Sequence, residues 1–143
     1  MINKVPVTVT KRFTFEACHR LVDYIGECER MHGHSYKMEV TVKGIPNDKN
    51  LLIDFKILKA LVKEAVIDKV DHQDLNEVMP KVYATEGNTT CESMIVAFWY
   101  AIEDRLAFYH YDNVELYRIR LWETESSYAE LTADMVREAG TNE

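Results

Sequence analysis

The chain has 143 residues, of which 47% are hydrophobic, and it carries a formal net charge of −7. A chain of this length and apolar content can bury its own core, so we expect a single domain over residues 1–143, with a core at about 7–131 and a tail at 132–143, and we exclude a disordered protein. The acidic balance argues against a nucleic-acid surface, the lack of a long apolar run against a membrane span, and three cysteines without a signal segment favour the cytoplasm.

Residues 7–19 are predicted to form the first strand, because apolar side chains alternate along them and His19 ends the strand on its apolar face. A second alternating strand begins at His32, so His32 and His34 leave the same, mostly apolar face. The intervening residues can fold back as a loop and bring His19 beside this pair. Three converging imidazoles are the ligand set of an open catalytic zinc site. The alternatives are two locally hydrogen-bonded histidines at a strand end and a core His19 satisfied by backbone.

The predicted helices follow. Asp54 is a candidate N-cap for an amphipathic helix over residues 54–68. Asp71 stands beside His72, where it can orient and polarise the imidazole or simply end the helix. Residues 77–88 are expected to form a loop. The sequence 89–92 predicts a capping box with Thr89 as the cap of a second helix, whose apolar stripe reaches to residue 106.

Residues 114–123 alternate as a third strand and residues 128–132 as a fourth, followed by a short helix in the tail. Glu123 has the core-facing parity, which is costly for a carboxylate unless it is paired. A ligand with two parallel N–H donors would satisfy it. The alternative is that the strand ends at Trp122 and Glu123 is solvated.

The predicted order is ββααββ. This order gives an α+β fold, a four-stranded antiparallel sheet with two helices on one face. Such a sheet leaves two edges open, and oligomerisation into a closed barrel would remove them.

Together these segments resemble the family of 6-pyruvoyl-tetrahydropterin and 6-carboxy-tetrahydropterin synthases. The resemblance rests on residues 13–19, 28–34, 53–55, 70–72, 75–76, 90–92 and 123–128. It implies a tunnelling (T-) fold and a homohexamer, a dimer of trimers with active sites at subunit interfaces. It implies zinc as the cofactor and a pterin triphosphate, 7,8-dihydroneopterin triphosphate, as the substrate.

The resemblance also implies roles for individual residues. They are the zinc ligands His19, His32 and His34, the catalytic residues Cys28, Asp71 and His72, and the pterin-binding residues Glu123 and Thr90. Thr90 is equally well explained as part of the capping box.

Cys28 stands four residues before His32, a spacing similar to that of the 6-carboxy-tetrahydropterin synthases of queuosine (7-deazaguanine) biosynthesis. Glu29, three residues before His32, resembles variants that make 6-hydroxymethyl-dihydropterin for folate. The chain has both residues, as does a subgroup credited with both activities. We therefore expect a lyase that makes 6-carboxy-tetrahydropterin, with Glu29 either a second base or a solvated loop carboxylate.

Three other functions stay open at this point. A 6-pyruvoyl-tetrahydropterin synthase would use the same ligand set. A non-catalytic zinc- or pterin-binding protein is disfavoured, because binding needs neither a thiol base nor an Asp–His pair. A structural zinc domain is disfavoured because three histidines have no obvious fourth protein ligand, although Cys28 could serve when substrate is absent.

Overall fold

The computed structural model describes residues 4–22, 26, 29–111 and 113–141. The strands are β1 (Val7–His19), β2 (His32–Gly44), β3 (Gln73–Asp74), β4 (Glu115–Thr124) and β5 (Ser127–Thr132). The helical segments are α1 (Phe55–Val62), the π-helical turn η3 (Lys63–Ile67), α2 (Asp68–Val70), α3 (Leu75–Tyr83), α4 (Cys91–Phe108) and α5 (Ala133–Thr141).

The strands form one sheet in the order β3-β1-β2-β4-β5. The four long strands are antiparallel neighbours, as predicted. The short β3 was not predicted, because two residues show no periodicity; it pairs in parallel with the end of β1, Ala17 opposite Gln73.

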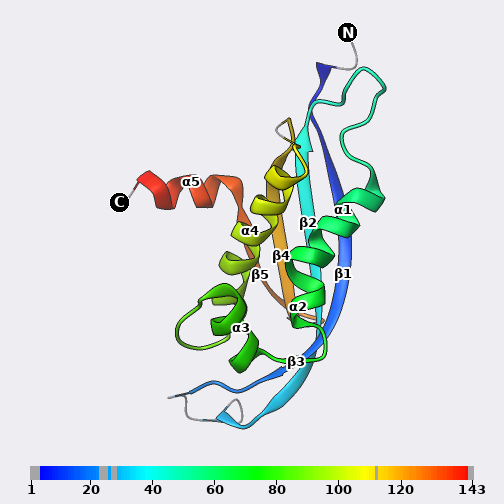
Figure 1. Ribbon diagram of the computed structural model, residues 1–143. Coiled ribbons are helices and arrows are strands. Elements are labelled where there is room, and N and C mark those ends of the chain that lie inside the picture. Colours follow the sequence, from blue (N-terminus) through cyan, green and yellow to red (C-terminus); the bar gives the residue numbers. More distant parts are fainter. Residues whose placement is uncertain (1–3, 23–25, 27–28, 112, 142–143) are drawn as a thin grey trace.

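One face of the sheet carries the core. Along β1 and β2 every second side chain is buried, from Phe13 and Phe15 to Met38 and Val40. Helices α1, α2 and α4 lie over this face in Figure 1. The predicted α+β arrangement, an antiparallel sheet with helices on one face, is therefore confirmed, and the histidines continue the same buried parity at one end of the sheet.

The first helix begins where Asp54 accepts a hydrogen bond from the backbone N–H of Lys56 at 2.7 Å. It runs without a break through η3 and α2 to Val70, two residues beyond the predicted end. This places Asp71 directly at the end of the helical run and next to β1.

Two local predictions are wrong. Residues 77–88 are not a loop, because α3 occupies most of them; Asp74 caps this helix by accepting from the N–H of Asn76, and Pro80 is tolerated within it. The cap of α4 is Thr90 rather than Thr89, since the Thr90 hydroxyl accepts from the N–H of Ser93 at 3.2 Å. Thr89 is instead buried, and its carbonyl oxygen contacts His19.

The tail forms α5, which projects away from the sheet in Figure 1. Among the described residues, no helix combines the length and the apolar composition that crossing a bilayer requires.

Candidate active site

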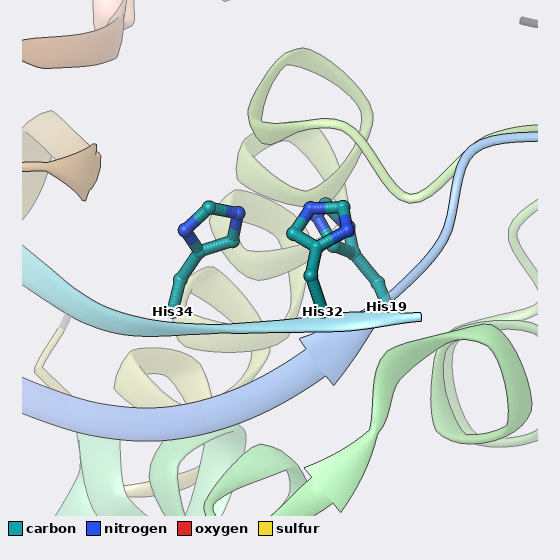
Figure 2. Close-up of side chains that lie close together, drawn as sticks. All are labelled: His19, His32 and His34. Atoms are coloured by element: carbon teal, nitrogen blue, oxygen red, sulfur yellow. The ribbon is translucent and has the colours of Figure 1, made fainter. Parts of the chain in front are cut away.

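Three histidines meet where β1 ends and β2 begins. The register of the two strands places His19 directly opposite His32, and His34 follows two residues later on the same face. Figure 2 shows the three rings rising on one side of β2. Their candidate ligand nitrogens all lie within 4.8 Å of one another. Sequence alternation alone predicted this convergence, and the three residues can together hold a metal ion.

Hydrogen bonds orient two of these rings. His19 is buried, and its Nδ1 lies 2.8 Å from the carbonyl oxygen of Thr89. His32 Nδ1 lies 2.7 Å from the carbonyl oxygen of Arg30. A carbonyl only accepts, so each Nδ1 carries the proton and each Nε2 offers a lone pair. The alternative to a metal site, local hydrogen bonding of the histidines, is therefore present. It uses only Nδ1 of each ring and leaves Nε2 directed toward the cluster, as in known metal sites.

His34 supplies the best test of whether a metal fits. Its Nε2 is buried and has no hydrogen-bond partner among the described residues. Burial lowers the pKa of His34, the nearby Glu123 carboxylate opposes this shift, and His19 and His32 add to it. A neutral imidazole with an unpaired buried nitrogen is the form that ligates a metal. The three-nitrogen donor set therefore fits a metal such as zinc, with a coordination position left open.

Glu123 closes the cluster on the side of β4. Its Oε1 lies 3.4 Å from His19 Nε2 and 3.5 Å from His34 Nε2. The side chain is 35% exposed, so it is half-buried rather than fully solvated. Together with Cys91 and Tyr128 it also lines an open pocket of about 240 Å³. Its carboxylate thus stands between the imidazoles and a space that a small ligand can enter.

Asp71 and His72 form a pair at the edge of β1. Asp71 Oδ1 lies 3.0 Å from His72 Nδ1 and accepts from the backbone N–H of Glu16 at 2.9 Å. The Glu16 N–H, and after it the His72 imidazole, hold the pKa of Asp71 below its ordinary value. A carboxylate that stays charged can orient the imidazole of His72 and fix its tautomer.

Within one chain this pair lies apart from the histidine cluster. His72 lines an open pocket of about 420 Å³ together with Cys18, Gly33 and Ser35. Those three residues alternate with the core-facing ones along β1 and β2, whereas His34, which also lines the pocket, has the core-facing parity. Among the described residues, no hydrogen bond or ion pair joins Asp71 or His72 to His19, His32 or His34.

The remaining predicted residues are placed as follows. Cys28 lies outside the described residues. Glu29 is exposed on the loop before β2, and its N–H donates to the Gly26 carbonyl at 3.3 Å. Thr90 caps α4. Sequence reasoning missed the contact of Thr89 with His19 and predicts Thr89 as that cap; of two adjacent threonines, nothing local indicates which one turns inward.

The fold and the histidine cluster define an α+β protein with a candidate metal centre, and comparison with known proteins places it further. The family described as 6-pyruvoyl tetrahydropterin synthase matches residues 8–134. The chain is 30% identical over 135 residues to the 6-carboxy-5,6,7,8-tetrahydropterin synthase of Haemophilus influenzae, covering 85% of this chain and 96% of that protein. It is 29% identical over 133 residues to the 6-pyruvoyl tetrahydrobiopterin synthase of Dictyostelium discoideum, covering 85% and 93%.

The fold agrees with this assignment. The solved structure of Caenorhabditis elegans 6-pyruvoyl tetrahydropterin synthase superposes with a TM-score of 0.78 at 21% identity, covering 93% of this chain and 99% of that one. The predicted tunnelling fold is thereby confirmed. The chain belongs to the 6-pyruvoyl tetrahydropterin synthase family and is a pterin synthase of the lyase class.

Proposed function

We propose that the protein converts 7,8-dihydroneopterin triphosphate and water into 6-carboxy-5,6,7,8-tetrahydropterin, triphosphate and acetaldehyde, a step of queuosine (7-deazaguanine) biosynthesis. The observation that carries this proposal is the convergence of three imidazoles beside a half-buried carboxylate. That arrangement offers a metal for the hydroxylated side chain of the substrate and an acceptor for its ring. The spacing of Cys28 to His32 supports the carboxylated product.

Zinc is the proposed metal, held by Nε2 of His19, His32 and His34. Three nitrogen donors with an open fourth position are typical of catalytic zinc. When bound, zinc acts as a Lewis acid that lowers the pKa of coordinated hydroxyl groups. The chain contributes the orientation of the rings through the carbonyls of Thr89 and Arg30.

Cys28 is the proposed base. As a thiolate it removes a proton from the side-chain carbon next to the pterin ring, and His72, oriented by Asp71, moves protons beside it. The Asp71–His72 pair makes no hydrogen bond or ion pair with the histidines of its own chain among the described residues. In the proposed homohexamer of two trimers, the pair of a neighbouring subunit completes each active site at an interface.

Glu123 is the proposed pterin anchor. A carboxylate can accept two parallel N–H donors, here the 2-amino group and the adjacent ring N–H of the pterin, and this fixes the register of the substrate. The pocket beside Glu123 supports the assignment. Thr90 caps α4, which begins beside this pocket, and is a weaker candidate for the same role.

A second activity is favoured by Glu29. It follows Cys28 in the sequence, three residues before His32, and is exposed, so its carboxylate is accessible as a second base. This route would release 6-hydroxymethyl-dihydropterin as a minor product for folate synthesis. A 6-pyruvoyl-tetrahydropterin synthase remains the alternative with the same ligand set.

The direct test is product analysis. Purified, zinc-loaded protein is incubated with 7,8-dihydroneopterin triphosphate, and products are separated by liquid chromatography and identified by mass. We expect 6-carboxy-tetrahydropterin and acetaldehyde in equal amounts. A pyruvoyl product with no acetaldehyde would support the alternative synthase, and binding without any product would indicate a non-catalytic protein.

A further inference from the structure

Tyr36 carries a buried hydroxyl that no described residue satisfies. The side chain is 0% exposed, and its ring stacks on Phe15 with a centroid distance of 4.8 Å. A buried hydroxyl without a partner destabilises a fold, and phenylalanine would fill the same space without that cost. Core packing therefore does not explain why position 36 carries a tyrosine rather than a phenylalanine.

The position of Tyr36 points toward the candidate site. It follows His34 by two residues on β2 and shares its face of the sheet. The Tyr36 ring lies 5.6 Å from the ring of His34 and 6.4 Å from that of His19, measured between centroids. It thus forms the wall of the histidine cluster on the side of the core.

The strand register brings Tyr36 to Glu123. Strands β2 and β4 pair Met38 with Leu121 and Lys37 with Trp122. The paired register ends there, and one further step along it would set Tyr36 across from Glu123, with both side chains on the core-facing parity. The Glu123 carboxylate also contributes, after burial, to a raised pKa of the Tyr36 hydroxyl, in agreement with this proximity.

A bound metal changes what Glu123 can contact. In the structure its Oε1 lies beside Nε2 of His19 and Nε2 of His34. His19 Nε2 carries no proton, because the ring donates through Nδ1 to the Thr89 carbonyl, and once His34 Nε2 ligates a metal it has no proton to donate either. A half-buried carboxylate then requires other hydrogen-bond donors, since burying an unpaired charge is costly.

We propose that Tyr36 is a positioning residue whose hydroxyl donates a hydrogen bond to the Glu123 carboxylate when the metal is bound, and so directs that carboxylate at the N–H edge of the pterin. The inference rests on the anchoring role proposed for Glu123. Two carboxylate oxygens provide about four acceptor sites, so one hydroxyl and two pterin N–H groups can bind together. A hydrogen bond from a hydroxyl to a carboxylate is charge-assisted and directional, which suits the task.

The test compares Tyr36→Phe with a matched control, Tyr83→Phe. Tyr83 is a partly buried tyrosine whose hydroxyl, unlike that of the fully buried Tyr36, has a partner: it donates to the Ala65 carbonyl at 2.7 Å. The probe is 7,8-dihydroneopterin without phosphates, titrated into zinc-loaded protein by calorimetry. Tyr36→Phe should weaken binding about tenfold and leave the zinc content unchanged. Its melting temperature without metal should stay the same or rise, because an unsatisfied group is removed.

Tyr83→Phe should show the reverse, a lower melting temperature with unchanged pterin binding. A double-mutant cycle then isolates the contact: in a Glu123→Gln background, Tyr36→Phe should change the pterin Kd by less than about twofold. Equal losses in both backgrounds, or no loss in either, would overturn the proposal. Tight pterin binding without turnover would instead contradict the proposed function and leave the role of Tyr36 standing.

Discussion

The two chemical groups of the candidate site differ in how one chain builds them. The histidine cluster is assembled within the chain: strand register sets the three rings, carbonyls orient two of them, and His19 is 1% exposed. The Asp71–His72 pair lies at the edge of β1, beside β3, and His72 is 77% exposed. The histidine cluster is built around a buried His19, whereas the acid–base pair faces an open surface.

In the homohexamer proposed above, this contrast corresponds to a division of labour between subunits. A metal site must be rigid, because ligand geometry sets affinity, and the hydrogen bonds from His19 and His32 to backbone carbonyls contribute to that rigidity. In that assembly a neighbouring subunit would deliver the acid–base pair to the substrate. Mutations in each group test whether zinc binding by the histidines and acid–base catalysis by the Asp71–His72 pair can be lost separately.

The largest expected effect is on metal content. His34→Ala should lose nearly all bound zinc, because two imidazoles alone hold zinc weakly. Asp71→Asn should keep full zinc and lose activity instead. The zinc content of both variants is measured by elemental analysis after dialysis against a zinc buffer, and their activity by product formation.

The control for this experiment is His110→Asn. His110 is an exposed histidine with φ of 61°, a conformation that asparagine tolerates. It should retain wild-type zinc and activity. Full zinc occupancy in His34→Ala would refute the ligand assignment.

The second prediction concerns sites shared between subunits. His34→Ala and His72→Ala should each be inactive alone, since each lacks one of the two groups. Unfolded together and reassembled in equal amounts, they should recover roughly a quarter of wild-type activity, because that share of interfaces joins two intact groups. Activity is measured per active site after removal of aggregates. No recovery in a correctly assembled mixture would show that both groups act within one chain.

The third prediction concerns Cys28 and Glu29, which are adjacent in the sequence, four and three residues before His32. Adjacent side chains of an extended segment point to opposite sides, so one conformation presents one of them to the substrate. Cys28→Ala should lose the carboxylated product and still release 6-hydroxymethyl-dihydropterin, and adding Glu29→Ala should abolish that release. Products are quantified by mass spectrometry. If Cys28→Ala yields neither product, Glu29 is not a base.

Much of the histidine side of this comparison could be predicted from the sequence. A period of two residues is local information, and it assigned β1, β2 and the common face of His19, His32 and His34. The cap at Asp54 was equally local. A polar stretch containing Pro80 concealed α3, although Leu75, Met79 and Tyr83 recur every four residues.

The other side depends on contacts between distant segments. The place of His72 follows from β3 pairing with the end of β1, where Cys18 lies opposite Asp74, and two residues give no periodic signal. The contact of Thr89 with His19 joins residues 70 positions apart. The unsatisfied hydroxyl of Tyr36 is defined by what surrounds it, which alternation along one strand does not reveal.

The smallest expected effect is on stability at the Asp71–His72 pair. Because the pKa of Asp71 is lowered from 3.8, the unfolded chain binds a proton before the folded one does as the pH falls. The stabilising contribution is therefore complete above about pH 4 and is lost as the pH falls through the lowered value. Asp71→Asn should melt about 1–3 °C below the wild type at pH 7 and at pH 5, since the pair is partly exposed, and the gap should close below pH 4.

Asp48→Asn, which removes an exposed loop carboxylate, should show no such gap. The dominant partner of Asp71 is the Glu16 N–H, which does not titrate, so the gap should also persist at pH 8. A gap that disappears between pH 6 and pH 8 in a melting series would contradict this assignment of the stabilisation to the Glu16 N–H.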